Sequence, residues 1–157
     1  MKQCFVSRKE IHMTINFKKI HPRAVAPQYG SALAGGADLR VITDTPIIIP
    51  PHKTEFCHTG IAAAFPEGWV GVVAARSGLA CKMDLAPANK IGIIDADYTG
   101  EIMVALHNHG ETPRRIEDGD RIAQLLIMPA PQATFIEVDE LAKTERGEGG
   151  FGSTGNK

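Results

Sequence analysis

The sequence lacks the features that mark several classes of protein. Its three cysteines, Cys4, Cys57 and Cys81, are scattered and odd in number, so they form neither a disulfide framework nor a paired zinc-ligand pattern. No run approaches the roughly 20 apolar residues that cross a bilayer, and the N-terminus lacks the apolar core of a signal peptide. We therefore expect a soluble, cytoplasmic protein with reduced thiols.

An excess of positive charge is also missing. Lysine and arginine number 17 against 18 aspartates and glutamates, whereas duplex nucleic acid and anionic membranes require a basic partner. Neither nucleic acid nor a membrane is therefore expected as a partner. A small charged ligand is compatible with this composition.

Long helical periodicity and internal repeats are absent as well, and short apolar runs fill the chain of 157 residues. Ten prolines and sixteen glycines lie mostly between these runs, where turns require fixed or positive φ. The pattern predicts one all-β domain, either a barrel-like domain or a double-sheet jelly roll. The expected strands are 15–20, 37–42, 47–49, 54–65, 69–75, 90–94, 101–108, 121–128 and 132–138.

The chain is expected to have three parts. Residues 1–13 are interpreted as a leader or tag-like extension, because Met13 is a second plausible start just before the first expected strand. Residues 14–141 form the β domain, in which one or two helical turns at 77–83 begin with Ser77 as the capping residue. Residues 142–157 are rich in lysine, glutamate, glycine and serine, and are predicted to form a mobile C-terminal arm.

A glycine-dense run at 146–155 contains Arg146, Phe151, Ser153 and Thr154. Glycines let successive amides turn toward one anion, arginine binds phosphate through a planar fork, and phenylalanine offers a flat face to a base. The run predicts a lid over a nucleotide. The alternative is an ordinary flexible terminus.

A second motif, Arg76-Ser77-Gly78, follows the apolar run 69–75. Strand ends that lead into a short helix bind phosphates, because amides there point outward without partners. The alternative is plain turn chemistry. No Gly-x-x-x-x-Gly-Lys-Ser/Thr loop is present, which argues against a mononucleotide-binding α/β fold.

The run 89–101 holds three carboxylates, of which Asp95 and Asp97 lie two residues apart, together with Asn89 and Tyr98 on one expected hairpin. If the segment is extended, the two aspartates share a face, and local geometry does not decide which of them acts. A purely structural hairpin turn is the alternative, since aspartate and glycine favour such turns for backbone reasons.

Four further polar residues stand out in the sequence: Asp38, Gln124, His107 and His109. Asp38 lies near a glycine pair before an alternating run, and Gln124 lies in an apolar run where its amide needs a partner, either a ligand or a neighbouring backbone group. His107 and His109 alternate, but a third metal ligand at sensible spacing is missing, so we interpret them as solvent-facing turn residues.

Taken in order, five segments resemble the five motifs of the trimeric dUTPases (deoxyuridine 5′-triphosphate nucleotidohydrolases). The segments are GGADLRV, ARSGLA, NKIGIIDADYTGE with its continuation to HNHG, GDRIAQLLI and RGEGGFGSTG, and they span residues 34–155. The resemblance implies a β jelly roll assembled as a homotrimer, with active sites shared between subunits and closed by the C-terminal arm. It also implies a dUTP diphosphatase, which hydrolyses dUTP to dUMP and pyrophosphate with Mg²⁺.

The resemblance assigns roles to individual residues. Asp95 resembles the group that activates the attacking water, and Tyr98 resembles the ring that packs on the deoxyribose. Asp38 is similar to the acid that holds a water of the magnesium shell, although Ala37 stands where the family often has a bulkier residue. The remaining implied substrate-binding residues are Asn89 and Ile94 for uracil, Arg76, Ser77, Gly78 and Gln124 for the phosphates, Phe151 and Gly152 over the base, and Arg146, Ser153 and Thr154 on the γ-phosphate.

Two other functions were weighed. The dCTP deaminases share this jelly roll and an Arg-Ser-type motif, but they rely on a glutamate that activates water against the pyrimidine, and Ile93 and Ile94 precede Asp95 here. A regulatory protein that signals through nucleotide-bound and free states would require loss of the acid or of the arm. Both are present in this sequence.

Overall fold

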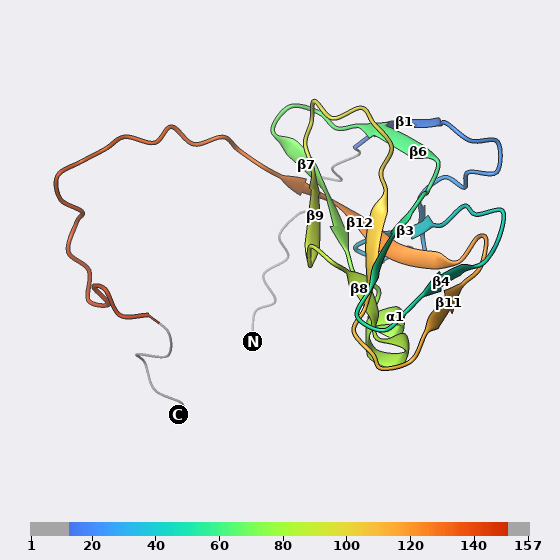
Figure 1. Ribbon diagram of the computed structural model, residues 1–157. Coiled ribbons are helices and arrows are strands. Elements are labelled where there is room, and N and C mark those ends of the chain that lie inside the picture. Colours follow the sequence, from blue (N-terminus) through green and yellow to red (C-terminus); the bar gives the residue numbers. More distant parts are fainter. Residues whose placement is uncertain (1–12, 151–157) are drawn as a thin grey trace, which may run out of the picture.

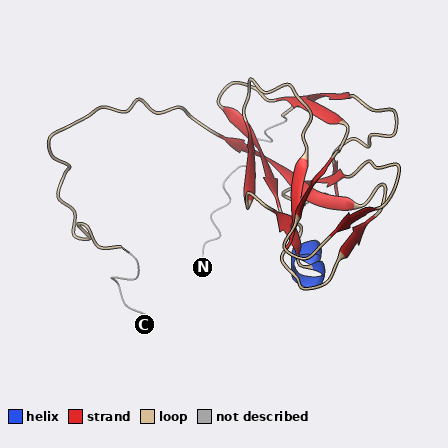
Figure 2. Cartoon of the chain, in the orientation of Figure 1, coloured by secondary structure: helices blue, strands red, loops and turns tan. Residues whose placement is uncertain are grey.

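The computed structural model describes residues 13–150 as a β domain followed by an extended C-terminal segment (Figures 1 and 2). The all-β prediction is confirmed, since strands dominate and one short helix is present among these residues. The elements are β1 (Asn16–Lys19), β2 (Gln28–Tyr29), β3 (Ala37–Arg40), β4 (Ile47–Ile49), β5 (Thr54–Cys57), β6 (Ile61–Ala64), β7 (Trp69–Ala74), α1 (Ser77–Met83), β8 (Leu85–Pro87), β9 (Ile91–Ile94), β10 (Val104–Asn108), β11 (Arg114–Ile116) and β12 (Arg121–Pro129).

Four antiparallel sheets surround one core. The largest has the strand order β2-β3-β12-β7-β9, and the others are β5-β10-β8, β1-β6 and β11-β4. Leu39, Ile49, Leu106 and Ile122, which come from three of these sheets, are 0–1% exposed and belong to one hydrophobic cluster. The apolar runs of the sequence therefore form the buried faces of the sheets.

The expected strand 54–65 is two strands, because the chain turns at Gly60. This glycine has a φ of +66°, and a Cβ atom there would lie 2.5 Å from Ile42 Cδ1. Strands β2, β8 and β11 contain only two or three residues each, which is too short for an alternating pattern to be recognised. The expected strand 101–108 begins only at Val104.

Helix α1 matches its expected range, but the expected cap is wrong. Ser77 is the first helical residue, and Arg76 occupies the N-cap with an extended backbone and no side-chain hydrogen bond to the helix. The helix ends at Met83, and its C-cap is Asp84, whose φ of 54° lies in the left-handed region. Arg76 is thus held at the junction of β7 and α1. Within residues 13–150, no helix is long and apolar enough to span a membrane.

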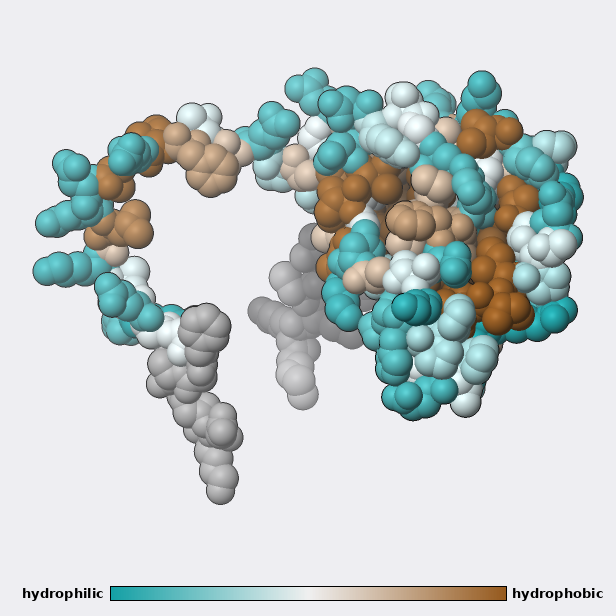
Figure 3. All heavy atoms as spheres, viewed as in Figure 1, coloured by the Kyte–Doolittle hydropathy of each residue, from teal (hydrophilic) through white to brown (hydrophobic). Residues whose placement is uncertain are grey.

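The C-terminal segment leaves the β domain after Pro129 (Figure 1). The expected strand 132–138 is not formed, and residues 131–148 are exposed throughout. A strand needs a neighbour for its backbone hydrogen bonds, and this segment has none within the described chain. Figure 3 shows hydrophobic side chains along it and on the visible face of the domain.

Candidate active site

An aspartate between two arginines forms the first part of the site. Asp38 on β3 is 7% exposed. Its Oδ1 accepts a hydrogen bond from Arg76 Nε at 2.8 Å, and its Oδ2 accepts one from Arg121 NH1 at 3.1 Å. Two guanidinium groups against one carboxylate leave a local excess of positive charge, which suits phosphate.

The register of β12 brings Gln124 into this cluster. Gln124 pairs with Asp38 on one side and with Ala74 on the other, and a Cβ atom on Gly36 would lie 3.0 Å from Gln124 Cβ. Among the described residues, no protein group hydrogen-bonds its side-chain amide. The strand-end residues Ser77 and Gly78 follow Arg76 directly and are exposed. Five of the predicted substrate- and metal-related residues are therefore neighbours.

The second part is a pocket of ≈ 250 Å³ between β9 and β10. Tyr98 N–H donates to the Asp95 carbonyl oxygen at 3.1 Å, so residues 95–98 form a turn. The segment is therefore not extended here, so the condition under which Asp95 and Asp97 would share a face is not met, and Asp95 is the aspartate that lines the pocket. The expected hairpin is not formed either, because β9 and β10 pair with other strands in different sheets. The pocket is lined by Phe56, Asn89, Ile93, Ile94, Asp95, Tyr98, Glu101, Met103 and Ala105.

The ring of Tyr98 has a defined place in this turn. Its hydroxyl donates to the Glu101 carbonyl oxygen at 2.9 Å, and a Cβ atom on Gly100 would lie 2.5 Å from that hydroxyl. Glycine at position 100 is therefore what lets the tyrosine fold back over the turn. Tyr98 is 42% exposed and lines the pocket.

Asp95 and Arg76 lie at opposite ends of the β7–β9 pair within one chain. Ile94, just before Asp95, pairs with Gly71, whereas Arg76 lies beyond Ala74 at the other end of β7. The five steps along the chain from Gly71 to Arg76 correspond to about 17 Å of extended chain. One copy of the chain does not bring Asp95 to Arg76.

The remaining candidates are less informative. Arg146 is exposed, and its Nε donates to the Gly149 carbonyl oxygen at 2.7 Å. The other candidates of the C-terminal run lie outside the described residues: Phe151, Gly152, Ser153 and Thr154.

The two histidines differ from each other. His107 belongs to β10 rather than to a turn, and its Nδ1 lies 2.8 Å from Thr54 Oγ1. His109 is exposed after that strand, and slight burial together with the neighbouring His107 and Lys90 lowers the pKa of its imidazole. Within residues 13–150, no three histidine, cysteine or acidic side chains are arranged to hold a metal ion.

Two residues of the site were missed from the sequence. Arg121 pairs with the buried Asp38. The signal in the sequence that could have identified Arg121 is a charged residue at the start of an apolar run. Glu101 ends the third motif segment, but the resemblance assigns it no role. It lines the pocket beside Tyr98, and its contacts involve residues more than 40 positions away, which the sequence alone does not show.

Comparison with known proteins shows the family of this chain. The family model for dUTPase matches residues 23–155. The deoxyuridine 5′-triphosphate nucleotidohydrolase of Syntrophotalea carbinolica is 43% identical over 91% of this chain and 97% of its own length, and that of Desulfitobacterium hafniense is 48% identical over 82% and 86%. The chain therefore belongs to the dUTPase family.

A solved structure is also similar. The dUTPase of Staphylococcus bacteriophage 80alpha, determined with dUpNHpp, superposes with a TM-score of 0.84 at 29% identity, over 90% of this chain and 98% of that chain. The D95N mutant of the phage phi11 dUTPase, described with a structural Mg(II) ion, is 22% identical and has a TM-score of 0.76. This second likeness concerns the fold alone.

Proposed function

We infer that this protein is a dUTP diphosphatase, which hydrolyses dUTP to dUMP and pyrophosphate. The observation that carries the inference is the pocket holding Asp95 and Tyr98 in a member of the dUTPase family. In a cell the reaction limits uracil incorporation into DNA and supplies dUMP for dTMP synthesis. The cytoplasmic location stays a prediction from the cysteine content.

The pocket between β9 and β10 supports roles for its polar residues. Asp95 is exposed at the pocket and accepts the proton of the attacking water. Tyr98 presents a ring face to the deoxyribose, where a ribose 2′-hydroxyl would lose its hydration at a cost of about 1–3 kcal/mol. Asn89 and the backbone at Ile94 read the uracil edge. Asn89 Nδ2 lies 3.4 Å from where a Cβ atom of Gly92 would be, so glycine leaves room for that amide.

The arginine cluster supports phosphate binding. Arg76 and the neighbouring Ser77, Gly78 and Gln124 contact the phosphates beside the scissile bond. Both carboxylate oxygens of Asp38 already bind guanidinium groups, which fits a residue that holds a magnesium-bound water rather than the ion itself. Mg²⁺ retains waters and binds mainly through phosphate oxygens, and it would neutralise charge on the departing pyrophosphate.

The separation of Asp95 from Arg76 supports an assembly with shared sites, and we propose the homotrimer. Apolar side chains that the chain itself leaves uncovered support the same conclusion, because contiguous exposed apolar surface marks interfaces. On the domain Phe56 is 66% and Ile93 56% exposed, and on the C-terminal segment Phe135 is 95% and Leu141 86% exposed.

The C-terminal run completes the proposed site. Phe151 and Gly152 cover the uracil, and Arg146, Ser153 and Thr154 bind the γ-phosphate. Closure of such an arm would exclude bulk water and align the triphosphate with the nucleophile.

Pyrophosphate release tests the proposal. The purified protein with Mg²⁺ should cleave dUTP far faster than dTTP, dCTP or UTP, and chelation of Mg²⁺ with EDTA should lower the rate. Absence of dUTP cleavage would contradict the assignment. Release of ammonia from dCTP would instead identify the deaminase chemistry of the same fold.

A further inference from the structure

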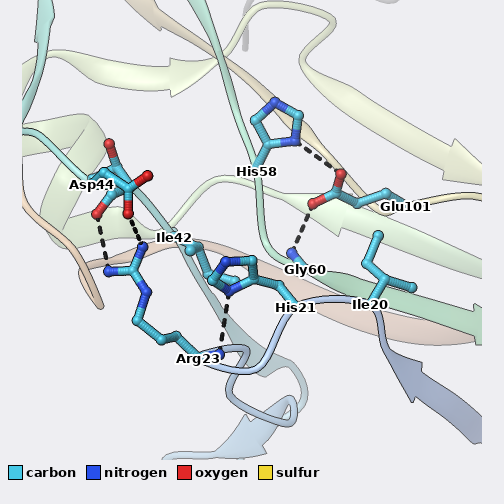
Figure 4. Close-up of a pocket in the computed structure, with 9 residues that line it drawn as sticks. Ile20, His21, Arg23, Ile42, Asp44, His58, Gly60 and Glu101 are labelled. Atoms are coloured by element: carbon cyan, nitrogen blue, oxygen red, sulfur yellow. Dashed lines mark hydrogen bonds and ion pairs between the residues drawn. The ribbon is translucent and has the colours of Figure 1, made fainter.

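Glu101 stands between two cavities. It lines the pocket that holds Tyr98, and it also lines a neighbouring cavity of ≈ 300 Å³ next to Ile20, His21, Arg23 and His58. Figure 4 shows its carboxylate directed toward His58 and Gly60. This residue therefore touches the turn that carries Tyr98 and the turn between β5 and β6.

Both oxygens of the Glu101 carboxylate are bound. Oε1 accepts from the Gly60 backbone N–H at 2.7 Å, and Oε2 accepts from His58 Nδ1 at 2.8 Å (Figure 4). Burial opposes ionisation of the group, but the bonds from His58, Gly60 and Thr59 outweigh it and lower the pKa of Glu101. The carboxylate is thus ionised at neutral pH, and charge-assisted hydrogen bonds of this kind are among the stronger ones.

The turn that receives this carboxylate is fixed from several sides. The His58 carbonyl oxygen accepts from Ile42 N–H at 2.7 Å, and the Gly60 carbonyl oxygen accepts from Ile20 N–H at 2.9 Å. Thr59 is 1% exposed, and its hydroxyl donates to the Ile102 carbonyl oxygen at 2.6 Å. The 58–60 turn can therefore act as a rigid support.

Glu101 also contacts Tyr98 directly, through its backbone. The Glu101 carbonyl oxygen accepts from the Tyr98 hydroxyl at 2.9 Å, and Glu101 forms an isolated β-bridge with Ala62. The turn at 95–100 has its own bond between Tyr98 N–H and the Asp95 carbonyl oxygen, but that bond fixes the backbone and leaves the ring free. The ring is held by the Glu101 carbonyl oxygen and by its contact with Gly100.

We propose that Glu101 is a positioning residue for sugar recognition: its carboxylate fastens the end of the 95–101 turn to the 58–60 turn, and its carbonyl oxygen sets the Tyr98 ring against the deoxyribose. This role rests on the proposed dUTPase function. It predicts that loss of the carboxylate weakens discrimination against a ribose 2′-hydroxyl. Base discrimination should persist, because β9 and β10, which flank the base, are held by their own pairing to β7, β5 and β8.

The kinetic test compares Glu101→Ala with a matched control. Glu111→Gln removes another carboxylate that pairs with a histidine, His52, at 3.3 Å, but both of those side chains are exposed. Glu101→Ala should lower the ratio of kcat/KM for dUTP over UTP by about tenfold or more, while the ratio of dUTP over dTTP stays within about twofold. Glu101→Gln keeps an acceptor for Gly60 N–H and should restore most of the first ratio, and Glu111→Gln should change neither.

A spectroscopic readout separates this proposal from the proposed activity. The chain has two tyrosines, Tyr29 and Tyr98, so 3-fluorotyrosine labelling gives two ¹⁹F signals that Tyr29→Phe assigns. Glu101→Ala should shift or broaden the Tyr98 signal and leave that of Tyr29 unchanged, whether or not the protein cleaves dUTP. If wild-type protein fails to cleave dUTP, the proposed function falls, and the Tyr98 signal still decides the role of Glu101.

Two results would overturn the proposal. One is a Tyr98 signal that is identical in wild type and Glu101→Ala. The other is an active Glu101→Ala variant whose preference for dUTP over UTP is unchanged within about twofold. If Glu101→Ala does not fold, His58→Ala decides, because it removes one of the two carboxylate bonds and should move the Tyr98 signal in the same direction. An unmoved signal in that variant also overturns the proposal.

Discussion

Replacement of Asp38 by asparagine tests whether this residue organises the two arginines. Asp38 is 7% exposed, and each of its oxygens accepts one guanidinium hydrogen bond, from Arg76 at 2.8 Å and from Arg121 at 3.1 Å. Asp38→Asn keeps one acceptor oxygen and places an amide NH₂ against the second guanidinium. One arginine therefore loses its partner and faces another donor.

The size of the effect follows from burial. Hydrogen bonds to charged groups contribute about 1.5–3 kcal/mol each. The side chains of Arg76 and Arg121 are 22% and 46% exposed, so water replaces part of the lost interaction. We expect the free energy of unfolding to fall by about 2–3 kcal/mol, which corresponds to a decrease in Tm of about 4–12 °C for a chain of this length.

The assay is thermal unfolding at one fixed protein concentration, with Asp44→Asn as the control. Asp44 also pairs with an arginine, Arg23, but the aspartate side chain is 94% exposed, so its loss should cost less than about 1 kcal/mol. A decrease in Tm for Asp38→Asn no larger than that for Asp44→Asn would refute the idea that Asp38 organises the arginines.

Three further predictions concern the acid, the arm and pH. Asp95→Asn should lower kcat by at least about a hundredfold while dUTP affinity stays within about tenfold, and equal losses in a binding titration and in turnover would argue against a nucleophile-activating role. Truncation after Leu141 should abolish most dUTP cleavage without lowering Tm, because residues 142–148 are exposed; unfolding of that protein would contradict the lid. The pKa of Glu101 is lowered from 4.5, so its charge stabilises the fold above that pH. The difference in the free energy of unfolding between wild type and Glu101→Gln, measured by urea titration, should therefore shrink as pH falls below 4.5. A difference that does not change with pH would contradict a stabilising charge on Glu101.

The class of fold and the family were predictable because the signals are local and ordered. Short apolar runs separated by glycine and proline predict strands, and the five motifs in sequence order identified the family that the match over residues 23–155 confirms. Local geometry did not decide between Asp95 and Asp97, and only the resemblance to the family selected Asp95. The structure places Asp95 at the pocket, where the backbone bond from Tyr98 to Asp95 turns the chain. The catalytic role of Asp95 stays a prediction.

Two other features lay beyond any sequence pattern, for different physical reasons. The run 132–138 has the composition of a strand, but a strand requires a partner, and none is available within the described chain. Glu101 ends the third motif segment, but its contacts are not visible in that motif, since its partners His58 and Gly60 lie 43 and 41 residues away. Tertiary contacts of this kind are created only when the sheets assemble.

Strand β7 links the two separated parts of the site through its register. It pairs Gly71 with Ile94 on β9 and Ala74 with Gln124 on β12, so one strand sets the places of Asp95 and of the arginine cluster. A slip of one residue would turn its buried side chains to the other face. Phe65 opposes such a slip, because a Cβ atom on Gly71 would lie 2.5 Å from Phe65 Cζ, and only glycine lets the ring pack so closely. The packing that stabilises the core therefore also fixes the distance that a second copy of the chain must span to complete the site.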